Sequence, residues 1–146
     1  MFDFLKSFFG DSDAQSGNTP SKAEKALQAL DIDVAIASHE NWKIRLQAHL
    51  NGTSTETLHA ETICFDNQCD LGKWIYGPGQ RLGHYPGFQA LINHHKMFHY
   101  SASNIVSLHN AGKNKEAQSL LNLQFENFSK DVIEDLQMMK KISTKK

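Results

Sequence analysis

Apolar residues recur at spacings of three and four along most of this chain, which is the period of an amphipathic α-helix. The pattern predicts a long helix over about residues 21–50, with a capping-box start at Ser21-x-x-Glu24 and an end at Asn51-Gly52. Asp31-Ile32-Asp33 is a candidate interruption of this helix. The expected buried positions are Ala26, Leu27, Leu30, Val34, Ala37, Trp42, Leu46 and Leu50.

Two further long helices follow from the same period. One starts at Pro86 or Gly87 and ends before the break Ala111-Gly112-Lys113-Asn114, and the other covers about residues 115–142. The first should bury Phe88, Leu91, Ile92, His95, Phe98, His99, Ala102, Ile105 and Val106. The second should bury Leu120, Leu121, Phe125, Phe128, Val132, Leu136 and Met139.

A short helix is predicted between the long ones, holding residues 69–76, with Asp66 or Asn67 as its cap and Gly77-Pro78-Gly79 as its end. Residues 53–68 are mixed, with room for one short helical turn, and no strand pattern is clear. The sequence therefore predicts an all-α fold: an antiparallel helical bundle of three long helices plus a short helix that bears Cys69.

Three long helices carry more apolar surface than a small three-helix core can hide, so we expect a homodimer. The last helix is the candidate seam of this dimer, through Phe125, Phe128, Val132, Leu136 and Met139.

Residues 1–20 differ from the rest of the chain. An aromatic cluster at the start is followed by a polar linker over residues 11–20, so this segment is expected to be semi-detached. The cluster consists of Phe2, Phe4, Leu5, Phe8 and Phe9. Docking to a partner, peripheral contact with a membrane and packing on the bundle stay open, although a single basic residue, Lys6, is a poor match for anionic lipid. Residues 21–142 are the folded domain, and residues 143–146 form a basic tail.

Composition narrows the function classes. A chain of 146 residues is one domain, and 15 basic against 16 acidic residues leave no basic face for nucleic acid. There is neither a secretory signal nor an apolar run of the roughly 20 residues that span a membrane. We therefore expect a cytoplasmic protein, in which Cys64 and Cys69 are not a disulfide framework.

Eight histidines draw attention to metal chemistry. His95 and His99 are four residues apart on one helix face, within a stripe that is otherwise apolar. Burying two unpaired imidazoles there would cost roughly 1–3 kcal/mol each, and a shared metal ion would remove that cost. His39 and Cys69 complete a set of three nitrogens and one sulfur, which suits tetrahedral Zn²⁺.

The order His39-x-x-Trp42, Cys69-x-Leu71-Gly72-x-Trp74 and His95-x-x-x-His99 resembles the chemoreceptor zinc-binding (CZB) domain family of bacteria over roughly residues 31–142. The resemblance implies that His39, Cys69, His95 and His99 are zinc ligands in a dimeric helical bundle with a regulatory role. Such domains pass a zinc or oxidant signal to chemoreceptors and diguanylate cyclases. This chain has no output domain, so it is expected to act as a stand-alone member on a separate signalling protein.

The donor set favours a sensor over an enzyme, because four protein ligands leave no open position on zinc for substrate. A zinc-bound thiolate is also the form of cysteine that oxidants attack. Two alternatives remain: a zinc store or carrier, and a hemerythrin-like metal bundle, which would need helix carboxylates near the histidines. The remaining residues of interest are assigned structural positions: Trp42, Trp74 and Cys64 in the core, and His49, His59, His84, His94 and His109 on the surface. For Cys64, the alternative is a resolving role for an oxidised Cys69.

Overall fold

The structure is a computed structural model that describes residues 21–144, and the regular elements within them are all helices. The long helices are α3 (Ile32–Asn51), α6 (Pro86–Asn110) and α8 (Glu126–Thr144). The shorter elements are α2 (Lys22–Gln28), α4 (Ala60–Ile63), α5 (Asp70–Ile75), the 3₁₀ helix η2 (Pro78–Leu82), α7 (Asn114–Leu120) and the π-helical η3 (Leu121–Phe125). The predicted Phe-rich segment, its linker and the last residues of the basic tail lie outside the described residues.

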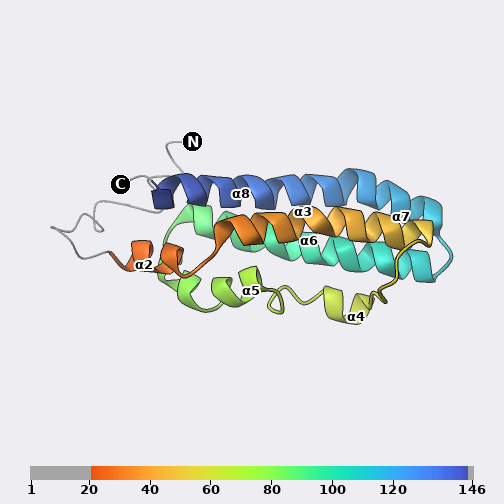
Figure 1. Cartoon of the computed structure of the whole chain (residues 1–146), viewed down its shortest axis with the longest axis horizontal. Helices are drawn as coiled ribbons and strands as arrows, with labels where there is room; N and C mark the ends of the chain where they lie inside the picture. Colours follow the sequence, from red (N-terminus) through yellow and green to blue (C-terminus); the bar gives the residue numbers. More distant parts are fainter. Residues whose placement is uncertain (1–20, 145–146) are drawn as a thin grey trace.

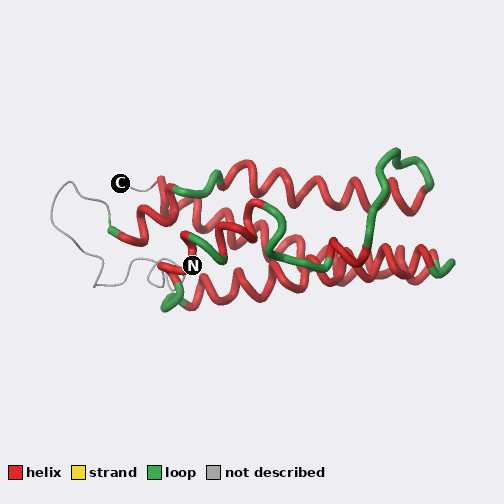
Figure 2. The backbone as a smooth tube through the Cα atoms, turned by 90° about the horizontal axis from the view of Figure 1, so that it is seen from below, coloured by secondary structure: helices red, strands yellow, loops and turns green. Residues whose placement is uncertain are grey.

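The predicted all-α bundle is confirmed, and Figures 1 and 2 show its long helices side by side. The predicted antiparallel order is correct for α8 but wrong for α3 relative to α6. α8 runs antiparallel to α3, as the ion pairs Lys43–Glu126 and Lys140–Asp33 require. α3 and α6 run in the same direction, because the segment between them, which carries α4, α5 and η2, returns the chain to the end where α3 began (Figure 1).

The candidate interruption at residues 31–33 is a real break between α2 and α3. Asp31 has an extended backbone and its carboxylate accepts a hydrogen bond from the N–H of Val34 at 3.1 Å, so it caps α3. Ser21 and Glu24 form the predicted capping box at the start of α2. The predicted single helix is therefore two helices with separate caps.

This break changes which side chains of α3 are buried. Val34 is 54% exposed and Ala37 is also exposed, so both were wrongly assigned to the core. The physical reason is the helical phase: α3 starts anew at Ile32, so Ile32, Ala35 and His39 face inward instead. The predicted stripe of α6 is confirmed, with only Ile92 half-buried.

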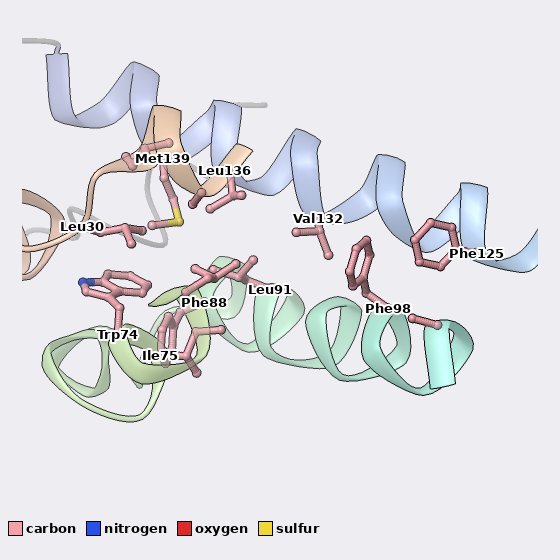
Figure 3. Packing of buried hydrophobic residues seen from close by; sticks show 14 of the residues in the cluster. Leu30, Trp74, Ile75, Phe88, Leu91, Phe98, Phe125, Val132, Leu136 and Met139 are labelled. Carbon is pink, nitrogen blue, oxygen red and sulfur yellow. The ribbon is translucent and has the colours of Figure 1, made fainter. Parts of the chain in front are cut away.

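The core lies between α8 and the other helices, as Figure 3 shows. Phe98 of α6 packs on Phe125 with ring centroids 4.8 Å apart, and Trp74 of α5 meets Phe88 edge-on at 5.9 Å. Trp74 also donates its indole N–H to the carbonyl of Ala26 at 2.7 Å, which fixes α2 against α5.

The predicted dimer seam is wrong. Four of its five residues have no exposed surface within a single chain: Phe125, Val132, Leu136 and Met139. The physical reason is that α8 packs between α3 and α6, so its apolar stripe is used inside the protomer. Phe128 is half-buried. The homodimer itself stays a prediction.

A π-helical turn joins α7 to α8, so residues 114–144 form one continuous rod rather than a regular α-helix. A π-turn holds one extra residue. Here Leu121 and Phe125 both stay buried while Leu123 is 65% exposed. No described helix is long and apolar enough to span a membrane.

Candidate metal centre

Three segments that are far apart in the sequence bring four side chains to one point. His39 lies on α3, His95 and His99 lie one turn apart on α6, and Cys69 is the residue that caps α5. One ligand atom of each residue lies within 4.8 Å of all the others, and this is the only such group among the described residues. The histidines are at most 4% exposed, and Cys69 is half-buried.

Four of the six distances between the donor atoms are close to those of a zinc tetrahedron, and all six are within 4.8 Å. Nε2 of His95 lies 3.2 Å from Nε2 of His39 and 3.1 Å from Nε2 of His99. Sγ of Cys69 lies 3.3 Å from Nε2 of His95 and 3.7 Å from Nε2 of His99. Bonds of normal length to one Zn²⁺ would place neighbouring nitrogens about 3.3 Å apart and the sulfur about 3.6 Å from each nitrogen.

The outer nitrogens of two rings fix which nitrogen faces the centre. Nδ1 of His39 donates to the carbonyl of Ala35 at 2.7 Å, and Nδ1 of His99 donates to the carbonyl of Ile63 at 2.9 Å. Their Nε2 atoms therefore carry lone pairs that face a common point, and too few N–H groups are there to form hydrogen bonds with them. A cation at that point satisfies them, and the backbone acceptors hold the rings in place.

Burial lowers the pKa of all three histidines and so favours the neutral form that binds a metal ion. Removal from water lowers the pKa of His39 to about 4, against a smaller raising effect of its bond to Ala35. Burial, with the charges of His99 and His39, lowers the pKa of His95 to about 2, and burial also lowers the pKa of His99. The imidazoles are neutral at pH 7, which is the form that binds metal.

Cys69, and not Asp66 or Asn67, caps α5, so that prediction is corrected. Cys69 has the extended backbone of a cap, and its Sγ accepts from the N–H of Gly72 at 3.4 Å. Burial raises the pKa of its thiol, while the N–H groups of Gly72 and Leu71 oppose this. A metal ion would supply the remaining positive charge that holds the thiolate.

Gly72 allows this cap to form. A Cβ at Gly72 would lie 1.8 Å from the carbonyl oxygen of Asp66, which no side chain permits. The tight approach of the loop to α5 therefore requires glycine, and it is this approach that turns Sγ of Cys69 toward the histidines.

A hollow of about 270 Å³ lies beside the centre. Its lining includes His39 and Cys69, together with Ser38, Asp70 and Trp74. Two of the four residues, His39 and Cys69, therefore border this hollow.

The other predicted residues are not members of the group of four. Nδ1 of His94 contacts Asp135 of α8 at 2.7 Å, so its ring points away from the ligands as the helix geometry required. Trp74 is a core residue, whereas Trp42 is half-buried beneath the Arg45 guanidinium at 3.9 Å. Cys64 donates its thiol to a backbone carbonyl at 3.6 Å.

Two of the histidines predicted to lie on the surface, His49 and His109, contact each other instead. His49 and His109 are half-buried and their ring centroids are 4.6 Å apart. The signal that could have found them is their offset, because each lies ten residues after a ligand, His39 and His99 respectively, on helices that run in the same direction.

Comparison with known families agrees with the site. The chemoreceptor zinc-binding domain family matches residues 39–106, a range that starts at one ligand and includes the other three. No curated protein and no solved structure matches this chain.

Proposed function

Because residues 39–106 belong to the chemoreceptor zinc-binding domain family, we propose that this chain is a regulatory module that binds Zn²⁺ and signals its presence or loss. The observation that carries the proposal is the convergence of three imidazole nitrogens and one sulfur at tetrahedral spacing. Four protein donors close the coordination sphere, which suits a structural or sensory ion and leaves no position for a substrate.

Cys69 is the proposed point of oxidant sensing. Zinc keeps the sulfur as a thiolate, and the neighbouring hollow admits small molecules to it. Oxidation of the thiolate to a sulfenic acid removes the sulfur ligand, so the affinity for zinc falls. Since the ligands belong to α3, α5 and α6, loss of the ion changes how these helices are held together.

A thiol-specific comparison tests this step. Zinc-loaded protein is treated with hydrogen peroxide, and released zinc is measured with a colorimetric chelator. We expect the wild type and Cys64→Ser to release zinc in step with sulfur oxidation, because Cys64 is the other free cysteine and is not a member of the group of four. Cys69→Ser should bind zinc at least about tenfold more weakly and show no peroxide-dependent release. Equal affinity and equal release in Cys69→Ser would refute the proposal.

The output is proposed to act in trans, on a signalling protein of the chemoreceptor or diguanylate cyclase type. The test is to add zinc-loaded and metal-free protein separately to such a purified partner and to measure binding and output activity. A difference that depends on metal and disappears in Cys69→Ser would support regulation. Identical effects of both forms would contradict it.

A zinc store or carrier is the second candidate, and the hollow favours it because the half-buried Cys69, whose sulfur is one of the four donors, lies in its lining. Rapid transfer of zinc to a chelator would support a carrier, and release only after oxidation would support a sensor. The hemerythrin-like alternative is not favoured, because the group of ligands contains a sulfur and no carboxylate.

A further inference from the structure

His49 and His109 lie at the opposite end of α3 and α6 from the residues that begin these helices, close to α7 (Figure 1). Their rings are 4.6 Å apart at an angle of 62°. Within the metal centre, His95 and His99 are also 4.6 Å apart, and His39 and His95 meet at the same angle of 62°. The rings of the distal pair are therefore as close together as two of the rings in the metal centre.

One ring of the distal pair, His109, is held through Nδ1 as two rings of the centre are. Nδ1 of His109 contacts the side-chain oxygen of Asn114 at 2.6 Å, and since that oxygen can only accept, Nδ1 carries the proton and Nε2 the lone pair. His39 and His99 use Nδ1 in the same manner with backbone carbonyls. Such an outer bond orients a metal-binding ring.

His49 adds an unsatisfied nitrogen. Its Nε2 is buried and has no hydrogen-bond partner among the described residues, which is a costly arrangement for an imidazole without a ligand. Burial and the neighbouring His109 lower the pKa of His49, so the ring is neutral near pH 7. The nearest carboxylate that affects it, Glu56, is already held by two hydrogen bonds to Arg45, at 2.9 and 2.7 Å.

We propose that His49 and His109 form a second site for a divalent transition-metal ion such as Zn²⁺ or Cu²⁺. Two imidazoles are its protein ligands, and water completes the coordination because both residues are half-buried. Two ligands rather than four make this site weaker than the His39–Cys69–His95–His99 centre. An ion there joins the last turns of α3 and α6, just as the main centre joins their middle parts.

A titration with Zn²⁺ alone tests the site. The intact chain is first loaded with one equivalent and then titrated further by calorimetry. The wild type should take up a second equivalent, and His49→Gln and His109→Gln should each weaken that step at least about tenfold while keeping the first. His84→Gln, which replaces an exposed histidine outside both groups, is the matched control and should bind both equivalents.

Two additional measurements separate a built site from general affinity for surface histidines. Asn114→Ala removes the outer acceptor and should weaken the second step about tenfold. In the imidazole ¹H–¹⁵N spectrum, Nε2 of His109 should shift with the second equivalent while Nδ1 stays protonated. Retention of one equivalent in both distal variants shows that they are folded. Absence of a second step in the wild type, or a second step unchanged in both His→Gln variants, would overturn the proposal.

Discussion

Three histidines whose pKa values are lowered by burial lie at the metal centre, and this makes the metal-free protein sensitive to acid. Below about pH 6.5 the unfolded chain binds protons on these side chains. The folded chain does not bind them until the pH approaches about 4 for His39 and about 2 for His95. The unfolded state therefore binds more protons in this range, so stability falls as the pH falls.

We predict that the free energy of unfolding of metal-free protein decreases between about pH 7.5 and about pH 5, each such histidine contributing at most about 1.4 kcal/mol per pH unit. Urea unfolding at several pH values measures this slope. His95→Gln should have a shallower slope because one titrating ring is gone. A slope equal to that of the wild type would contradict the assignment of this acid sensitivity to the centre.

At the residue scale, the sequence was sufficient to predict which four side chains gather at the centre, because the order of His39, Cys69, His95 and His99 resembles that of a zinc-binding family. It was not sufficient for the distal pair. Whether His49 meets His109 depends on the relative direction of α3 and α6, which local periodicity does not contain.

The contact between α5 and the loop before it is the tightest element-scale feature of the centre. We predict that Gly72→Ala displaces this loop, because its Cβ would lie 1.8 Å from the carbonyl oxygen of Asp66. Stability should fall by roughly 3 kcal/mol or more, and zinc affinity should fall with it since Cys69 moves. Thermal unfolding and zinc competition measure the two effects.

Gly52→Ala is the matched control for that substitution. Gly52 has a positive φ of 74° but no atom within 4 Å of an added Cβ, so the change should cost about 1 kcal/mol and leave zinc affinity unchanged. Equal zinc affinity in Gly72→Ala and the wild type would show that the loop does not position the sulfur.

The π-turn at Leu121–Phe125 offers a second element-scale test. Because a π-turn holds one extra residue, deletion of the exposed Leu123 should restore a regular helix and keep both flanking stripes in phase. We predict a change in stability of at most about 1 kcal/mol and unchanged zinc affinity. Deletion of the exposed Lys130 from regular α8 should unfold the protein, because it turns the following stripe by about 100°. Similar losses in both deletions by circular dichroism would disprove this.

The periodicity of apolar residues correctly predicted where the long helices occur. It did not predict which side chains face the core after a helix break, or in which direction neighbouring helices run. Val34 and Ala37 fell on the predicted stripe only because the pattern was continued through the break at Asp31. The π-turn leaves the spacing of apolar residues nearly unchanged, so the sequence does not reveal it. The same-direction arrangement of α3 and α6 follows from the path of residues 52–85, whose elements are too short for periodicity to define.

At the scale of the whole molecule, zinc should act as a stabilising ligand of the folded state, because its four donors converge only there. With free zinc at about 100 times the dissociation constant, we predict a gain of about 2.7 kcal/mol over metal-free protein. Calorimetric melting with and without a chelator measures it. No shift on removal of zinc would mean that the ion binds equally well to the unfolded chain.

The homodimer remains a whole-molecule prediction whose interface must differ from the stripe of α8. The exposed large apolar side chains available for it are Val34, Ile44, Phe65, Tyr76, Met97, Tyr100 and Leu123. Sedimentation velocity at micromolar concentration should give a dimer. Ile44 is 68% exposed, and the substitution Ile44→Glu is a first test of whether this side chain lies in the interface. A monomer at that concentration would contradict the prediction.

The four ligands are anchored very unequally. Three belong to helices of 20 and 25 residues, and the fourth precedes a helix of only six residues. When the cation departs, amide protons of α5 should exchange with deuterium much faster, whereas those in the middle of α6 keep their protection. If residues 66–76 open locally when the ion is lost, that edge of the protein is where a partner could distinguish the two forms.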